Sequence, residues 1–149
     1  MQAFTQPTKQ SDIKREWHVI DIKDQTLGRS AVTIAHLLMG KKKPYFVRNL
    51  DCGDYVVVVN AKNVKVTGKK EEQKTYYRHS MYPGGFRAET LKELRQRKPE
   101  DIIIHAVKGM LPQNKLRDRM LKRLRVFAGE DHKYEDKFKH DNLDLEAKN

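Results

Sequence analysis

The clearest chemistry in this chain lies in the basic segment of residues 108–125. It holds seven cations against a single acid, Asp118. The cations are Lys108, Lys115, Arg117, Arg119, Lys122, Arg123 and Arg125. The apolar residues within 116–124 recur at offsets of four, five and eight, which places them on one side of a helix. One face can therefore pack in a core while the other presents fixed positive charge to a polyanion.

Further basic residues gather in predicted loops and at predicted helix ends. Within residues 78–87, arginines can bind phosphate oxygens, glycines let backbone amides approach phosphate, and Tyr82 or Phe86 could stack on an unpaired base. We predict that these groups contact RNA together with the basic segment. Their members are Arg29, Lys41, Lys42, Lys43, Lys69, Lys70, Arg78, His79, Gly84, Gly85 and Arg87.

Each basic group also has an interpretation that needs no RNA. The helix within 116–124 could carry a solvated charged face, and lysines 41–43 could stabilise a helix dipole by about 0.3–1 kcal/mol. Residues 82–87 could form an ordinary surface turn with Phe86 in the core. The ratio of seven cations to one acid favours RNA for the basic segment, where Gly109 and Pro112 are expected to set the turn that aims the helix.

The charge of the whole chain points to the same class of partner. The net charge is +11, divided into +14 over residues 1–129 and −3 over residues 130–149. A cationic body favours nucleic acid over a membrane or an acidic small molecule. With 38% hydrophobic residues in 149, the chain suits one domain with a real core.

The cysteine count and the apolar runs indicate the compartment. Cys52 is the only cysteine, so no intramolecular disulfide can form, and a reducing compartment is expected. The start of the chain has neither an apolar signal core nor an arginine-rich presequence. The longest apolar run, residues 55–59, is far shorter than the roughly 20 residues of a membrane span. We expect a soluble, intracellular protein.

No pattern in the sequence indicates catalysis, a metal or a cofactor. The six histidines never pair at metal-ligand spacing, and one cysteine cannot form a zinc cluster. Asp51 and Asp54 are expected to stabilise a turn, and between them Cys52 should resist deprotonation. Residues 26–30 open a helix after a strand but lack both a dinucleotide glycine fingerprint and a phosphate-loop lysine.

Hydrophobic periodicity predicts strands that alternate with helices. The valine run at 55–59 is typical of a strand buried on both faces, as in a parallel sheet. At 102–104 we favour a helix over a strand, since Pro99 suits a first helical turn. The predicted strands are 17–22, 55–59, 75–78 and 125–127, with 64–67 a strand or a turn. The predicted helices run from Thr26 or Ser30 to Gly40, from Thr90 to Arg97 with a Thr90–Glu93 capping box, from Pro99 through 102–110, and over 116–124.

These elements predict a three-layer α/β/α single domain. We assign residues 1–129 to the domain, with an N-terminal arm over 1–15, and residues 130–149 to a charged, mobile tail. Residues 41–44, 69–74 and 82–87 are expected to be loops.

Five motifs carry a resemblance to a known family. In order they are Thr26-Leu27-Gly28-Arg29, Asp51-Cys52-Gly53-Asp54-Tyr55, Val66-Thr67-Gly68-Lys69, Pro83-Gly84-Gly85-Phe86-Arg87 and Val107-Lys108-Gly109-Met110-Leu111-Pro112. Over residues 1–130 the chain resembles the bacterial-type family of large-subunit ribosomal protein thirteen. It departs from the family pattern at Arg117, where a small residue is usual and a guanidinium contact would replace backbone approach to phosphate.

The resemblance implies a fold and a function. The expected fold is α/β/α with a small, mostly parallel four-stranded sheet and extended basic loops. The expected partners are large-subunit ribosomal RNA and neighbouring large-subunit ribosomal proteins, with a role in subunit assembly and translation and no catalysis. The expected location is a bacterial-type cytoplasmic ribosome, with an organellar ribosome left open.

Two other functions compete with this one. A sequence-specific DNA regulator would use the helix within 116–124 in a major groove, and it would need a helix-turn-helix pair and a dimer surface. A small nucleotide-binding enzyme would need a convergent acid–base or metal constellation. The sequence displays none of these features.

Overall fold

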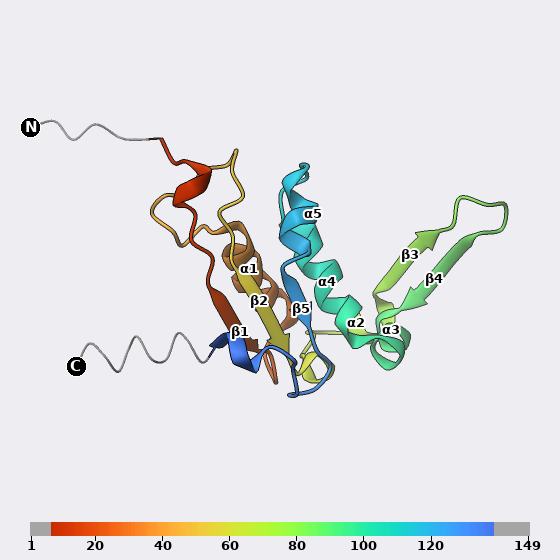
Figure 1. The fold of residues 1–149 in the computed structure, drawn as a ribbon. Helices are drawn as coiled ribbons and strands as arrows, with labels where there is room; N and C mark the ends of the chain where they lie inside the picture. The colour runs from red at the N-terminus through yellow and green to blue at the C-terminus, as the bar shows by residue number, and fades with distance from the viewer. Residues whose placement is uncertain (1–6, 139–149) are drawn as a thin grey trace, which may run out of the picture.

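The computed structural model describes residues 7–138 and gives a mixed α/β fold (Figure 1). The first six residues of the predicted arm and residues 139–149 of the predicted tail lie outside this range. Within it, no helix is long and apolar enough to cross a membrane. The strands are β1 Trp17–Asp21, β2 Tyr55–Val59, β3 Thr75–His79, β4 Phe86–Thr90 and β5 Leu124–Val126. The helices are α1 Leu27–Met39, α2 Lys70–Gln73, α3 Leu91–Arg97, α4 Pro99–Met110 and α5 Leu116–Leu121, with short 3-10 turns η1 Gln10–Asp12 and η2 Ala61–Asn63.

The main sheet is parallel and has the order β1-β2-β5. Its centre is the valine run of β2, and Val57 pairs with Val19 of β1 and Arg125 of β5. Val56, Val57 and Val58 are fully buried. Branched side chains suit such a strand because they fill a pleated surface covered on both sides. The predicted buried, parallel central strand is therefore confirmed.

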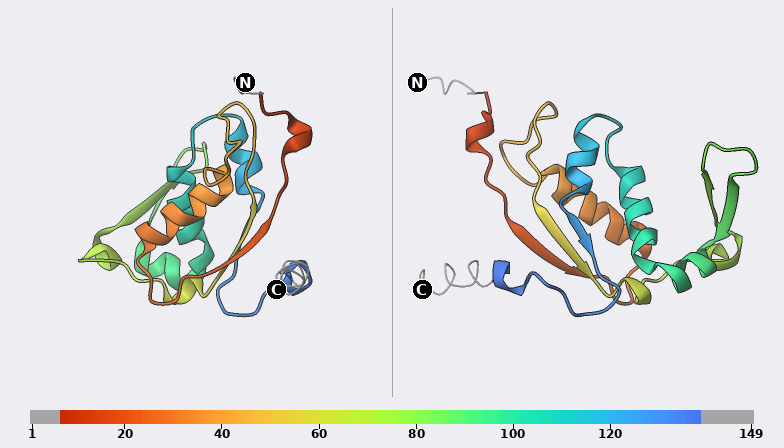
Figure 2. Two further views of the ribbon diagram at one scale, coloured as in Figure 1. Left: turned by 90° about the vertical axis from the view of Figure 1, so that its left-hand side faces the viewer. Right: turned by 45° about the vertical axis from the view of Figure 1, so that its right-hand side comes forward.

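Helices α1 and α4 cover one face of this sheet (Figure 2, left). Ile34 and Leu38 of α1 and Ile102 of α4 share one apolar core with Val56 and Val58. This arrangement confirms the helical assignment of residues 102–104. The α/β class is likewise confirmed.

The opposite face of the sheet carries aromatic side chains. Because side chains alternate along a strand, Tyr55 and Trp17 point away from α1, and their rings stack with centroids 4.4 Å apart. Tyr134 stacks on Trp17 at 5.3 Å, and Phe138 meets the same ring edge-on at 6.2 Å. The start of the segment 130–149 thus packs on the sheet. The mobility of the tail remains a prediction.

The strand count differs from the expected four-stranded sheet. The main sheet has three strands, while β3 and β4 form a separate antiparallel hairpin. This hairpin projects from the body beside α3 (Figures 1 and 2). Phe86 and Arg87 start β4 rather than belonging to a loop. The mixed sequence of β4 lacks the alternation that announces a strand.

Helix boundaries follow local signals closely. Thr90 and Glu93 form the predicted capping box, Pro99 opens α4, and α1 ends at Gly40 in the left-handed region with φ 77°. Two predictions were wrong. The expected loop 69–74 contains the short helix α2, and the helix expected over 116–124 ends at Leu121, because the next residues turn into β5.

Gly109 also lies elsewhere than expected. It sits inside the last turn of α4 rather than in the turn that follows, and a Cβ built on it would meet nothing within 4 Å. Helical glycine costs roughly 0.5–1 kcal/mol relative to alanine. Gly53 is the opposite case, since its Cβ would lie 1.7 Å from the carbonyl oxygen of Leu38.

We therefore expect Gly109→Ala to raise the free energy of unfolding by up to about 1 kcal/mol in urea denaturation. Gly53→Ala should destabilise the fold strongly in the same measurement, because two backbones cannot move apart cheaply. A destabilised Gly109→Ala variant would show that the backbone of α4 is constrained there by something other than the helix.

Candidate nucleic-acid interface

The basic segments meet because the sheet is parallel. Parallel strands all start at the same edge, so the segments that precede β1, β2 and β5 converge there (Figure 1). We call residues 12–16, 41–54 and 115–123 the amino-edge surface. These three segments hold eleven cations and five acids.

Arg123 ties its own segment, 115–123, to the segment 41–54 and to the end of α1 from the inside. It is 7% exposed, and its Nη1 and Nη2 donate to the two carboxylate oxygens of Asp51. Its Nε donates to the carbonyl oxygen of Asp54 at 3.3 Å, and Nη2 to that of Leu38 at 3.4 Å. Nη2 would lie 2.9 Å from a Cβ at Gly53, so glycine leaves it room. Arg123 is therefore an internal tie whose donors are taken by protein acceptors, and its contact with RNA stays a prediction.

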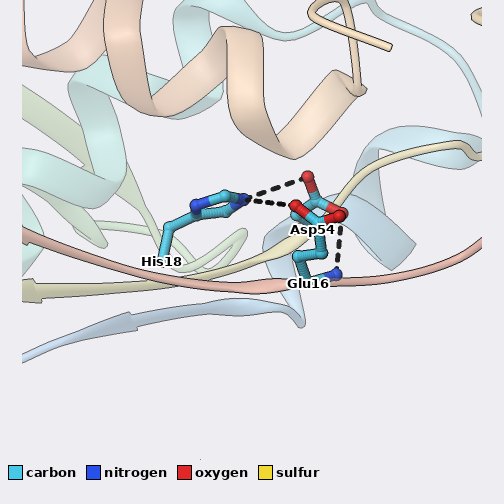
Figure 3. Close-up of side chains that lie close together, drawn as sticks. All are labelled: Glu16, His18 and Asp54. Carbon is cyan, nitrogen blue, oxygen red and sulfur yellow. Dashed lines mark hydrogen bonds and ion pairs between the residues drawn. The ribbon is translucent and has the colours of Figure 1, made fainter. Parts of the chain in front are cut away.

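Asp54 is the second internal anchor (Figure 3). Its Oδ1 accepts from the backbone N–H of Glu16 at 3.0 Å and from the ammonium of Lys43, and its Oδ2 lies 3.2 Å from Nε2 of His18. Lys43 Nζ also donates to the carbonyl oxygen of Lys14. The Lys43 side chain is only 11% exposed. Of the three consecutive lysines, Lys43 thus serves the fold rather than the surface.

The electrostatics of Asp54 follow from these contacts. Burial alone favours the neutral acid and raises the pKa of Asp54. Hydrogen bonds from His18, Lys43 and the Glu16 amide outweigh that effect, so the pKa lies below its ordinary value of 3.8. Asp54 is therefore held as a carboxylate.

Glu16, His18 and Asp54 lie close enough to share a metal ion, a grouping that the histidine spacing did not predict. Glu16 Oε2 is 4.0 Å from His18 Nε2. However, both oxygens of Asp54 already have donors, and Lys43 already supplies a positive charge. The cluster is better described as a salt-bridge network. It went unrecognised in the sequence because Asp54 lies far along the chain from Glu16 and His18.

Asp51 and Asp54 also differ from their predicted role. They bind side chains and backbone of other segments rather than stabilising their own turn. Arg15 adds a further link, since its Nη1 donates to the carbonyl oxygen of Gly53 at 2.6 Å. Buried acids of the amino-edge surface are therefore paired with Lys43 and Arg123 in the interior.

The cations that remain at this edge are exposed and, within residues 7–138, form no ion pair. They are Lys14, Lys41, Lys42, Arg48, Lys115, Arg119 and Lys122. Lys41 and Arg48 line one hollow of about 410 Å³ with residues 110–112 and Asn114. Arg119 lines another of about 300 Å³ with Arg15. The sequence analysis did not predict Lys14 and Arg48 as binding residues, because nothing in their own segments indicates that they lie beside the other exposed cations of the amino-edge surface.

Arg117 is half-buried, and its Nε is buried without a hydrogen-bond partner among the described residues. Arg29 and Lys108 are exposed on α1 and α4, and Arg125 is exposed on β5. None of these four joins the internal network of Asp51 and Asp54.

A second group of cations borders a groove of about 680 Å³ between α1, α2 and α4. Lys70 and Lys74 line it, and Gly28 and Gly109 form part of its walls. Lys69 is exposed just before α2. The groove thus brings together Gly28, Lys70 and Gly109, which lie far apart in the sequence.

The third group lies on the β3–β4 hairpin. Arg78 and Arg87 are cross-strand partners and line a groove of about 460 Å³ with Arg97 and His105. His79 is exposed, and Gly84 and Gly85 lie in the turn between the strands. The interpretation that buries Phe86 in the core is wrong, because this ring is exposed.

This geometry defines a class of protein. A compact α/β core holds cations outward on three surfaces, and residues 7–138 bring together no nucleophile, general base and acid. Such a molecule suits a structured polyanion rather than catalysis.

The comparisons with known proteins identify the family. The sequence model of ribosomal protein L13 matches residues 15–133. The large ribosomal subunit protein uL13 of Dehalococcoides mccartyi is 58% identical over 128 residues, which cover 86% of this chain and 90% of that protein. The uL13 protein of Aquifex aeolicus is 51% identical over 127 residues, covering 85% and 88%. The chain belongs to the ribosomal protein L13 family, which confirms the resemblance seen in its motifs.

We expect Arg123→Met to lower the free energy of unfolding by about 3 kcal/mol, because it leaves the Asp51 carboxylate without its main partner. The melting temperature should fall by roughly 6–12 °C for a chain of this size. Arg119→Met, an exposed neighbour, is the control and should stay within about 0.5 kcal/mol. Equal effects of the two substitutions in thermal and urea unfolding would contradict the buried tie.

Acid should weaken the fold through Asp54. Because the folded pKa is lowered, the stabilisation by this group is present above its unfolded value near 3.8 and is lost as pH falls through the folded pKa. We expect the free energy of unfolding to decline below about pH 4. Asp54→Asn should be less stable at pH 6 and show a shallower decline, whereas Asp118→Asn should follow the wild type. A decline of the same steepness in Asp54→Asn would contradict this assignment.

Proposed function

We propose that this protein binds large-subunit ribosomal RNA mainly through its amino-edge surface, with the α1–α2–α4 groove and the hairpin as further contacts. The protein is a non-enzymatic constituent of the large ribosomal subunit, of the bacterial, cytoplasmic type, as its family membership indicates. The observation that carries the proposal is the set of seven exposed cations at one edge of the sheet, which form no ion pair with any residue in the described range 7–138.

The division of charges at this edge supports phosphate binding. Asp51 and Asp54 lie inward and bind Arg123 and Lys43. The exposed acids of the segments are only Asp12, Glu16 and Asp118. Without these two internal pairs the segments keep nine cations and three acids, so the net charge stays at +6 while the ratio of cations to acids rises from 11:5 to 9:3.

The rigid attachment of these cations has an energetic consequence. Lysine and arginine side chains displace condensed counterions when they contact phosphate, whatever the scaffold. Here the backbones of the three segments are tied to one another, so their charges keep a fixed spacing. RNA that already has the matching fold is then favoured over RNA that must rearrange. Contacts to phosphate should dominate, with little reading of base identity.

Bridging of RNA segments would support subunit assembly, because it offsets the repulsion between phosphates that fold together. Neighbouring large-subunit proteins are further proposed partners. The two competing functions gain no support. Helix α5 has six residues, too few to read a major groove in the manner of a recognition helix. Residues 26–30, where α1 begins, have neither the glycine fingerprint nor the lysine of a phosphate-binding loop.

The test removes two exposed charges at a time. We expect Arg119→Gln with Lys122→Gln to weaken binding to transcribed large-subunit ribosomal RNA and to reduce the salt slope by up to about 1.8, at about 0.7–0.9 per lost phosphate contact. Binding would be measured by filter retention over a series of KCl concentrations.

The matched control is Lys23→Gln with Lys62→Gln. These exposed lysines follow β1 and β2, at the opposite edge of the sheet, and their removal changes the net charge equally. The control should bind nearly as the wild type does. Equal losses in the two double variants would mean that only total charge matters, which would refute the amino-edge surface as the main contact.

A further inference from the structure

The β3–β4 hairpin has two chemically different faces. In its register, Tyr76 lies opposite Glu89 and Arg78 opposite Arg87, while the alternate pairs are Tyr77 with Ala88 and His79 with Phe86. Side chains of directly opposed residues share a face, and successive pairs alternate between faces. One face is therefore charged and the other is aromatic.

The charged face is turned toward the body. The Tyr76 ring lies 5.3 Å from the ring of His105 of α4, and Glu89 pairs with Arg97 of α3. The aromatic face is the opposite one, and only its Tyr77 and Ala88 also border the groove shared with α3 and α4. Its two rings are open to solvent: Tyr77 is 69% exposed and Phe86 is 60% exposed.

These two rings form one surface. Tyr77 and Phe86 come from neighbouring strands and stack with centroids 5.8 Å apart and ring planes 21° from parallel. Neither ring belongs to the main core, and the hairpin residue that packs against that core is Tyr76. Exposed aromatic rings on adjacent strands are the arrangement with which small β-sheets stack unpaired RNA bases.

The turn of the hairpin is ordered by its own hydrogen bonds. Ser80 N–H donates to the Gly85 carbonyl at 3.2 Å, and Gly85 N–H donates to that of Tyr82 at 2.9 Å. The N–H of Met81 donates to Nδ1 of His79 at 2.9 Å, which holds Met81 in the left-handed region at φ 68°. Met81 nevertheless points its side chain into solvent, at 90% exposure. The platform is thus flanked by a fixed turn.

The charges of the hairpin favour RNA over a protein as the occupant. Arg78 and Arg87 face each other directly across the strands, where like charges repel, and within residues 7–138 neither forms an ion pair. A nucleotide strand that stacks a base on one face can offer phosphate to these guanidiniums at the strand edges. An apolar protein surface would add no negative charge here, and only the interaction of Arg78 with Glu89 would offset the repulsion.

We propose that the outward face of the β3–β4 hairpin is a stacking platform for unpaired bases of the bound RNA, formed by Tyr77 and Phe86. This inference rests on the proposed function and adds a contact that does not depend on charge. Because stacking releases no phosphate counterions, its loss should change affinity without changing salt dependence.

The experiment uses the full-length protein and transcribed large-subunit ribosomal RNA. The test variant, Tyr77→Leu with Phe86→Leu, keeps apolar bulk and removes both rings. We expect its affinity to fall about tenfold at every KCl concentration, with the salt slope of the wild type. The matched variant, Arg78→Gln with Arg87→Gln, should lower the slope by up to about 1.8.

A ring exchange, Tyr77→Phe with Phe86→Tyr, is the second control and should bind as the wild type does, since both rings remain. Dimethyl sulfate probing should reveal unpaired bases that the wild type and the exchange variant protect and that the leucine variant leaves reactive. Thermal unfolding of the leucine and ring-exchange variants should be similar to that of the wild type, because the Tyr77 and Phe86 rings are exposed to solvent.

Three outcomes would overturn the platform. Wild-type affinity of the leucine variant for the RNA would do so, and so would an exchange variant as weak as the leucine variant. A leucine variant that binds RNA normally but fails to join large subunits containing their other proteins would assign the face to a protein partner. None of these results would change the result expected for Arg119→Gln with Lys122→Gln, which tests RNA binding by the amino-edge surface. Failure of the stacking platform and failure of the proposed RNA binding are therefore distinguishable.

Discussion

The ion pair between Arg123 and Asp51 is the contact on which the arrangement of this surface depends. A parallel sheet brings the segments before its strands to one edge, but nothing in the sheet itself fixes their loops there. The guanidinium of Arg123 does so, because it binds Asp51 while also reaching the carbonyl oxygens of Leu38 and Asp54. Burying this charge is favourable only when its N–H donors are hydrogen-bonded. The ion pair therefore fixes how the end of α1 and the segments 41–54 and 115–123 are placed relative to one another.

This internal pairing also shapes the outer surface. Each inward acid is neutralised by an inward cation, and Asp54 with Lys43 repeats the pattern set by Asp51 with Arg123. Among the described residues of these segments, only the exposed acids Asp12, Glu16 and Asp118 are then left to compete with phosphate for the exposed lysines and arginines. Two aspartates that lower the net charge of the edge in a simple count thus support its proposed role in RNA binding, because they hold the cationic loops in place without facing the solvent.

Local signals in the sequence were sufficient for most of the fold. The Thr90–Glu93 box, the valines of β2 and Gly40 each act within a few residues, and each element formed as predicted. The inward turn of Arg123 could not be predicted, because a run of basic residues does not reveal which of them will meet an acid more than sixty residues away. The separation of β3 and β4 from the main sheet depends likewise on tertiary packing, which no periodicity records. Family motifs located the basic regions correctly but did not distinguish structural cations from exposed ones.

The two parts of the surface complement each other physically. Charge on the rigid body acts at a distance of about one Debye length, roughly 8–10 Å, and attracts any RNA. Aromatic rings act only in contact, and only on bases that are not already paired. An RNA that has folded so as to leave particular bases unpaired near the hairpin can satisfy both parts, whereas a misfolded RNA of equal charge satisfies only the first. In the proposed division of roles, the projecting hairpin with its aromatic rings adds selectivity for a folded state to the affinity that the cationic body supplies.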